Sequence, residues 1–393
     1  MFWNIIYFFD WICFIPIAFT VLYIFLFSIT SLFFSHTKIP KAKKQNRFIV
    51  LIPAYRQDKA ILNTVKSILG QSYPQRMFDV IVISDHQSEM TNMHLAQYPI
   101  TLLTPNFETS TKAKSLQYAI MNLPEFKIYD VVVLLDADNI VESEFLEQIN
   151  DAYENAGSKA ILTHKLPKNR DTASARLDSI FEEINTSIFR RGHTAIGLSA
   201  ALTGSGVAYE FAWFRNNIMK VRSAIEDKEL EALLLRQHIY IDYIDDIYVY
   251  DEKTRQLEDL NKQRGRWATN QIRSMFTNIR YLPAAIINRH YDWADKIIQW
   301  ILVPRIIMMT VIFIMSIVLP FIYMTAAIKW WIAAFVVTFA FALATPNDMV
   351  DEHWDLDFMT LPFKAVATIY KKLHLPSIPK IAIPKIKLKK SSK

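Results

Sequence analysis

Asp136 and Asp138 are the residues of this chain with the clearest potential for chemistry. They follow an apolar run, Val131 to Leu135, which is typical of a buried parallel strand, so both carboxylates leave the strand at its carboxyl end. Ligands of open α/β sheets bind in the crevice at that edge. Two carboxylates one residue apart supply hard oxygen ligands, suited to Mg²⁺ or Mn²⁺ carrying a diphosphate. An isolated Asp-x-Asp triplet more often marks a solvated turn, so the hypothesis depends on the motifs around it.

Two other strand ends carry side chains that could recognise a nucleotide. Asp85 follows the apolar run Val80 to Ser84, where its carboxylate could accept a hydrogen bond from a base NH. A strand-terminating turn is an equally good interpretation of Asp85 alone. Pro53, Ala54 and Tyr55 end an earlier strand and offer backbone atoms and a ring to the base.

Lys112 and Lys114 open a predicted helix that extends to Met121. A lysine at a helix start can approach a phosphate, helped by the free backbone amides there. Ordinary surface lysines explain the pair as well, and Lys114 is the candidate for donor binding.

Glu226 and Asp227 stand just ahead of a leucine-rich helix. Acidic residues often occupy the first helical turn for dipole reasons, which accounts for them without any catalytic role. A catalytic base also needs such a position, on a rigid helix start facing a cleft. Upstream, Gly204 and Ser205 belong to a small-residue turn where a substrate could approach the backbone closely.

The string from Gln263 to Trp267 is the most specific local pattern. Arg264 and Arg266 flank a glycine, and guanidinium groups can hold a diphosphate through paired hydrogen bonds. The indole face of Trp267 suits a sugar ring. A basic, aromatic stretch at a membrane interface is the competing interpretation.

Taken in order, these motifs resemble a known signature. Asp85, Asp136-Ala137-Asp138, Glu226-Asp227 and Gln263-Arg264-Gly265-Arg266-Trp267 look like the D, DxD, ED and QxxRW motifs of membrane-bound family 2 glycosyltransferases. That group includes cellulose, chitin and hyaluronan synthases. Asp251-Glu252-Lys253 also resembles a string often found before QxxRW in this family.

The resemblance implies a GT-A fold, a nucleotide-sugar donor (a UDP-sugar is expected), a divalent cation and inversion at the anomeric carbon. Ile225 departs from the Thr or Gly that many polymer synthases have before Glu-Asp. The candidate roles are metal binding by Asp138 and Asp136; proton abstraction by Asp227, with Glu226 beside it; donor binding by Pro53, Ala54, Tyr55, Asp85, Lys114, Asp136, Arg264 and Arg266; and acceptor binding by Gly204, Ser205, Gln263 and Trp267.

The elements that must position these residues alternate between strand and helix. Strands are expected at Phe48 to Pro53, Val80 to Ser84, Ile100 to Leu103 and Val131 to Leu135, and helices at Lys59 to Gly70, Lys112 to Met121 and Glu142 to Asn155. Such alternation predicts an α/β fold with a mostly parallel sheet and helices on both faces. The segment 158–252 has a more mixed pattern.

Three apolar segments are long enough to suggest membrane-spanning helices. They are Ile5 to Phe34, Ile306 to Met324 and the shorter Trp330 to Ala344. The first does not resemble a signal peptide, because it is too long and has neither a basic start nor a small-residue cleavage site. Asp10 is the one charge near its start.

Basic residues predict the orientation of these spans. Five of them follow the first span and others fill the tail, whereas the loop between the last two spans has only Lys329. We therefore expect a multi-pass protein of the cell membrane, the bacterial inner membrane, with its amino terminus outside and its catalytic domain and tail in the cytoplasm. The charge of +6 is explained by anionic lipid headgroups, so no nucleic-acid partner is expected. The single cysteine, Cys13, excludes disulfides and thiolate metal sites.

The expected organisation is an amino-terminal span (1–36), a catalytic domain (47–270), interfacial helices (271–300), two spans (301–346) and a basic membrane-adjacent tail (347–393). Three function classes follow: a synthase that extends a glycan, an enzyme that adds one sugar to a lipid acceptor such as a polyprenyl phosphate or a ceramide-like lipid, and a non-catalytic scaffold. Three spans are fewer than cellulose or hyaluronan synthases use for their channels, which leaves a homo-oligomer or a separate export partner open.

Overall fold

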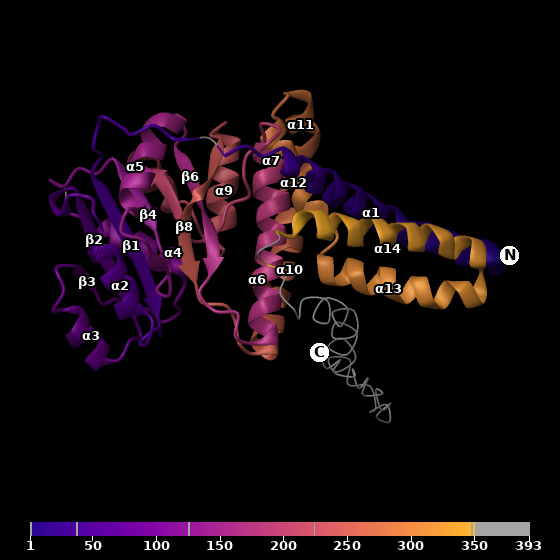
Figure 1. The fold of residues 1–393 in the computed structure, drawn as a ribbon, viewed down its shortest axis with the longest axis horizontal. Coiled ribbons are helices and arrows are strands. Elements are labelled where there is room, and N and C mark those ends of the chain that lie inside the picture. The colour runs from indigo at the N-terminus through magenta and orange to yellow at the C-terminus, as the bar shows by residue number, and fades with distance from the viewer. Residues whose placement is uncertain (1, 37, 125, 224, 347–348, 350–393) are drawn as a thin grey trace, which may run out of the picture.

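The computed structural model describes residues 2–36, 38–124, 126–223, 225–346 and 349. The expected basic tail, 347–393, lies outside the described residues apart from Met349. Figure 1 shows a sheet domain at one end, a bundle of long helices at the other, and the helices α6 (Ala173–Thr186) and α10 (Leu257–Asn278) between them. The amino terminus lies at the far end of the helical bundle (Figure 1).

The domain is built on a mixed sheet with the strand order β3-β2-β1-β4-β7-β6-β8-β5. Four pairings are parallel (β3 with β2, β2 with β1, β1 with β4 and β6 with β8), and the other three are antiparallel. The strands are β1 (Phe48–Tyr55), β2 (Phe78–Asp85), β3 (Thr101–Leu103), β4 (Val131–Leu134), β5 (Ile140–Val141), β6 (Ala160–Pro167), β7 (Val207–Glu210) and β8 (Ile241–Asp251). The α/β prediction is confirmed, and the parallel half is the half whose strands the apolar runs predicted.

Helices cover both faces of the sheet because both faces of its central strands are apolar. Alternate residues of β1 point to opposite sides: Phe48, Val50 and Ile52 enter one core, whereas Ile49 and Leu51 enter the other. The first core is shared with α2 (Ile61–Leu69) and α5 (Phe145–Ala156), and the second with α4 (Lys112–Met121), α8 (Phe211–Ile218) and α9 (Glu226–Arg236). The short helix α3 (Glu89–Leu95) follows β2.

The helix boundaries agree with the predicted ones to within a few residues, with one informative difference. α4 begins and ends at the predicted residues, and Thr111 caps it by accepting a hydrogen bond from the Lys114 amide at 3.2 Å. α5 begins at Phe145 rather than Glu142, because Ile140 and Val141 pair with β8 as a short antiparallel strand.

Among the described residues, three helices are long and apolar enough to cross a membrane: α1 (Phe2–Thr30), whose apolar span is Tyr7–Phe33, α13 (Arg305–Ile322) and α14 (Met324–Ala344). α14 begins six residues before the expected Trp330, and its 21 residues extend about 31 Å at 1.5 Å per residue. Asp10, the charge near the start of the first span, is buried in the bundle, where Trp330 donates a hydrogen bond to it at 2.8 Å and Lys329 pairs with it. Charges inside apolar helices are expected to pair in this way.

Shorter helices join the bundle to the domain. They are α7 (Gly192–Thr194), α11 (Leu282–Ile287) and α12 (Tyr291–Ile301), and a π-helical turn, Ser187–Arg191, links α6 to α7. Ile180, Ile184 and Ile188 pack with Ile17 and Val21 of α1 in a third apolar cluster. The sheet domain is therefore packed against the bundle by its own side chains.

Candidate active site

The carboxyl ends of β1 and β2 bring Tyr55 and Asp85 side by side. These two residues are register partners in the parallel pair, and Asp85 is buried whereas Tyr55 is half exposed. His86 contacts the Asp85 carboxylate through Nδ1 at 2.5 Å, and its ring meets the Tyr55 ring edge-on at 5.7 Å. The Arg56 guanidinium lies 5.2 Å from the centre of the same ring. This edge of the sheet thus combines a carboxylate with aromatic faces, and Arg56 and His86 join the predicted Tyr55 and Asp85 there.

The acidic triplet forms a tight turn after β4. The Asn139 amide donates to the Asp136 carbonyl oxygen at 3.0 Å, and the Asn139 side chain accepts from the Asp136 amide at 2.9 Å. The Asn139 side-chain amide also lies 3.3 Å from the Asp138 carboxylate. Asn139 is fully buried and therefore fixes the direction in which both carboxylates leave the strand.

Lys112 joins the acidic triplet to two other candidate motifs. Its ammonium group pairs with Asp136, donates to the Gly204 carbonyl oxygen at 2.7 Å and lies 3.7 Å from Glu226. A β-carbon on Gly204 would lie 3.4 Å from that ammonium and 3.6 Å from the Glu226 carboxylate, so the turn approaches the cluster closely. Lys112 thus brings together Asp136 and Glu226, which are 90 positions apart in the chain.

The other lysine of the same helix turn has a different environment. Lys114 donates to the Thr109 carbonyl oxygen at 2.7 Å and to its hydroxyl at 2.5 Å, within the preceding loop. The structure therefore brings Lys112, rather than Lys114, to the acidic residues.

Glu226 and Asp227 form the first turn of α9, as the helix-start pattern predicted. Glu226 is buried and Asp227 is more open, with 21% of its side chain exposed and its carboxylate 3.9 Å from Lys228. Burial raises the pKa of Glu226 to about 7, although the positive charge of Lys112 opposes the shift. Ser205 is buried beside this turn.

The arginine and tryptophan string lies inside α10, at the junction with the helical bundle (Figure 1). Gln263 accepts a hydrogen bond from Thr254 at 3.3 Å, and the Arg264 guanidinium lies 4.2 Å from the centre of the Phe181 ring. Arg266 and Trp267 are exposed. Within the described part of the chain, no hydrogen bond or ion pair joins this string to Asp136, Asp138 or Lys112.

Residues 45–270, more than half of the chain, match the protein family described as "Glycosyltransferase like family 2". The chain belongs to this family. No curated protein matches the sequence. Among solved structures, the chain is similar to the mannosyltransferase PcManGT from Pyrobaculum calidifontis, which was solved in complex with GDP-Man and Mn²⁺. The TM-score is 0.56 and the sequence identity 15%, and the match covers 93% of this chain and 99% of that one.

Two structures of TarS from S. aureus, both of residues 1–349, also match this glycosyltransferase. The complex with UDP has a TM-score of 0.38 and 18% identity, covering 57% of this chain and 65% of that one. The complex with UDP-GlcNAc has a TM-score of 0.39 and 16% identity, covering 77% and 93%. The likeness to the mannosyltransferase supports the GT-A-like fold with its three apolar helices.

The electrostatics of the acidic triplet in this glycosyltransferase suit a divalent cation. Burial, joined by the nearby carboxylates of Asp136 and Asp251, raises the pKa of Asp138 to about 6. Burial also acts to raise the pKa of Asp136, but the cations of Lys112 and Lys165 outweigh it and hold that pKa well below its usual range. Among the described residues no three His, Cys, Asp or Glu side chains form a closed metal site. Two carboxylates completed by substrate phosphates are the arrangement that Mg²⁺ usually takes, so the residues fit.

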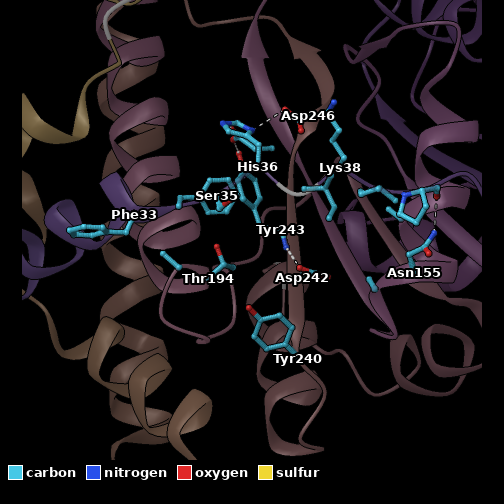
Figure 2. A pocket seen from close by; sticks show the side chains of 18 residues that line it. Phe33, Ser35, His36, Lys38, Asn155, Thr194, Tyr240, Asp242, Tyr243 and Asp246 are labelled. Carbon is cyan, nitrogen blue, oxygen red and sulfur yellow. Dashed lines mark hydrogen bonds and ion pairs between the residues drawn. The ribbon is translucent and has the colours of Figure 1, made fainter.

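A cavity of about 570 Å³ lies elsewhere on the domain, between the linker that follows α1 and the strand β8 (Figure 2). Figure 2 shows His36 of the linker paired with Asp246 of β8, at 3.0 Å. None of the candidate site residues lines this cavity. The candidate active site therefore lies at the carboxyl ends of the strands and not in this cavity.

Proposed function

We propose that this glycosyltransferase transfers a sugar, with inversion, from a nucleotide-sugar donor to a growing glycan at the cytoplasmic membrane face. It would act as a polysaccharide or oligosaccharide synthase of the cellulose, chitin and hyaluronan synthase type. The observation that carries the proposal is the cluster in which Lys112 contacts Asp136, the Gly204 carbonyl oxygen and Glu226. Single displacement needs a carboxylate for the acceptor proton and cations for the departing diphosphate. Lys112 is such a cation, and Asp227 is the carboxylate that follows Glu226 in the first turn of α9.

Several of these residues have a distinct task in this reaction. Tyr55 and Asp85 bind the base, and the small residues Gly204 and Ser205 let the acceptor approach the backbone. Asp227, the more open of the two carboxylates at the start of α9, removes the proton from the acceptor hydroxyl. Lys112 and Arg266 donate hydrogen bonds to the diphosphate as its charge develops.

A divalent cation held by Asp138 and Asp136 would neutralise the same charge as a Lewis acid. The Mn²⁺ and GDP-Man bound by the similar mannosyltransferase support a metal and a nucleotide sugar. For the present chain we expect a UDP-sugar as the donor.

The direct test is hydrolysis and transfer by the full-length protein in nanodiscs, measured across a panel of nucleotide sugars. One donor should be consumed faster than the rest. NMR spectra of its product should show that the configuration at the anomeric carbon is inverted relative to the donor. The absence of turnover with every donor would contradict the proposal and favour a non-catalytic scaffold.

A second candidate function is transfer of one sugar to a lipid acceptor, and two arginines favour it. Arg264 forms no hydrogen bond or ion pair with any described residue, and its Nη2 atom is buried. Arg305, at the start of α13, donates to Asn185 at 2.6 Å and has no carboxylate partner among the described residues. Two such guanidiniums beside the bundle suit the phosphate of a lipid. Product length separates the functions, because a synthase yields a ladder of products and the lipid enzyme yields one.

Trp267→Ala is expected to lower transfer to the acceptor more than slow hydrolysis of the donor by water. The reason is that an exposed indole on α10 offers a stacking face to a sugar and no proton acceptor. The ratio of hydrolysis to transfer measures the effect. Phe276→Ala, which removes another exposed aromatic ring from the same helix, is the matched control and should leave the ratio unchanged. Equal losses of hydrolysis and transfer would contradict the acceptor-binding role and indicate that Trp267 anchors the helix at the membrane interface.

The proposed topology has the amino terminus outside and residues 48–290 in the cytoplasm. In a Cys13→Ala background, a cysteine at Ser110 should escape an impermeant thiol reagent in intact cells and react after lysis. A cysteine at Met324, the first residue of α14, should react in intact cells. Labelling of the Ser110 position in intact cells would refute the proposed orientation.

A further inference from the structure

Helix α12 carries a stripe of polar side chains on its protected face. Asp292, Asp295, Lys296 and Gln299 are spaced at i, i+3, i+4 and i+7, which places them along one side of the helix. Lys296 is only 3% exposed and Gln299 only 8%. An interfacial helix normally turns such residues to water, so the partners of this stripe need an explanation.

Lys296 connects the stripe to the helix that begins with Glu226 and Asp227. Lys296 pairs with Glu231 of α9 at 2.7 Å, and Glu231 is completely buried. Glu231 also accepts a hydrogen bond from the Leu202 amide at 2.6 Å and lies 3.5 Å from Lys228. Lys228, the neighbour of Asp227, donates to the Leu202 carbonyl oxygen at 3.2 Å. Glu231 therefore ties α9 to the segment that leads into the Gly204 turn.

The same stripe holds that segment at a second point. Asp292 accepts a hydrogen bond from the Ser199 amide at 2.6 Å. Residues 199–204 are thus held from the membrane side by Asp292, and from the catalytic side by Lys112 at the Gly204 carbonyl oxygen.

Asp295, next to Lys296 in the stripe, contacts the first apolar helix. Tyr23 of α1 donates a hydrogen bond to Asp295 at 2.6 Å and contacts His193 at 2.8 Å. Gln299 donates to Asp295 at 2.8 Å, accepts from Lys296 at 2.6 Å and lies 3.1 Å from His193. The contacts form an unbroken chain from Tyr23 to Glu231.

α1 also packs closely against Gly192 and His193, next to this chain of contacts. The His193 ring stacks on Phe27 with 3.7 Å between ring centres. A β-carbon on the adjacent Gly192 would lie 2.3 Å from the Phe27 carbonyl oxygen, so only glycine allows the backbones to approach this closely. The polar chain therefore starts from a fixed point on α1.

Stability alone does not account for this arrangement, because apolar residues of similar volume often replace a buried ion pair without loss. We propose that the Lys296–Glu231 pair is a positioning device, which sets α9 and its Asp227 relative to the Gly204 turn and couples that setting to α1. The inference rests on the proposed role of Asp227. Lys296 and Glu231 are positioning residues, since neither touches the site of the reacting atoms.

The test compares single and double variants of the full-length enzyme in nanodiscs. Lys296→Met should lower kcat by about 10–100-fold, because a displacement of about 1 Å can cost that much, and should leave the donor KM nearly unchanged. Lys296→Arg should restore most of kcat. The double variant Glu231→Gln/Lys296→Met should recover the thermal stability lost in Lys296→Met but not its kcat. Lys66→Met, at an exposed position of α2, is the control and should match the wild type.

A double variant with wild-type kcat would overturn the proposal, since the pair would then contribute only to folding. If the wild type turns over no nucleotide sugar, the proposed function itself fails. If the wild type is active and Lys296→Met equals it, the positioning role alone fails.

The coupling to α1 has its own measurement. Tyr23→Phe should lower kcat in the wild-type background and have little further effect in the Lys296→Met background, because both act through one chain of contacts. Tyr7→Phe, which changes an exposed tyrosine of the same helix, is the control. Independent effects of Tyr23→Phe and Lys296→Met would overturn the link to α1.

Discussion

Asp227→Asn is expected to lower sugar transfer by about 10²–10⁴-fold, the usual loss when a general base is removed. Asparagine keeps the shape of the side chain but cannot take the acceptor proton. Asp227 lies at the start of α9, beside the turn that contains Gly204, and is open enough to meet an acceptor. Donor binding should stay nearly unchanged, because the donor diphosphate is held by other groups. Transfer rates and calorimetric titration with the nucleoside diphosphate measure the two effects separately.

Glu226→Gln is the matched comparison for this prediction. If Glu226 is the base, Glu226→Gln will show the large loss and Asp227→Asn will keep near-wild-type transfer, which would contradict our assignment. The folded pKa of Glu226, about 7, is above its ordinary value of 4.5. Its contribution to stability is therefore fully present below about 4.5 and is lost as the pH rises through about 7. Glu226→Gln should flatten this part of the stability curve in thermal unfolding across that window.

The parts of the fold that sequence predicted are those where one local signal decides the structure. β1, β2 and β4 are continuous apolar runs, since both of their faces are buried. β8 was missed, because Asp242, Asp245 and Asp246 interrupt its apolar residues and made the segment look mixed. In the structure Asp245 is buried against Arg191 at 2.8 Å, a partner 54 positions away that no local pattern indicates.

The same distinction applies to the candidate site. The rule that ligands bind at the carboxyl ends of parallel strands predicted the edge where Asp85 and Asp136 lie. Helix geometry could have separated Lys112 from Lys114, because residues two positions apart are about 200° apart around a helix and cannot face one cleft. Arg264 and Arg266 obey the same geometry inside α10: Arg264 lies over Phe181, whereas Arg266 is exposed. Periodicity thus indicates that only one member of each pair faces inward, but neither which member nor which partner it meets.

Asp138→Ala is expected to abolish transfer, by more than about 10²-fold, while the protein remains folded. A bound cation supplies several kcal/mol of charge stabilisation, and each 1.4 kcal/mol is worth about tenfold in rate. Excess chelator should have the same effect on the wild type, and added Mn²⁺ or Mg²⁺ should reverse it. Asp246→Ala, which removes an exposed carboxylate of β8, is the control and should keep wild-type activity. Full activity in excess chelator would contradict the metal assignment.

The two carboxylates of the triplet should differ in this experiment because their surroundings differ. Asp136 already has Lys112 and Lys165 as cationic partners, so a metal adds less there, and Asp136→Ala should mainly weaken donor affinity by freeing those lysines. At Asp138, burial and the carboxylates of Asp136 and Asp251 outweigh the cations of Lys165 and Lys168 and raise the pKa, so its negative charge has a cost that a divalent cation would relieve. Titration of Mn²⁺ into each variant with the nucleoside diphosphate should therefore show a larger loss of metal affinity for Asp138→Ala than for Asp136→Ala. The reverse order would make Asp136 the principal ligand and Lys112 its competitor.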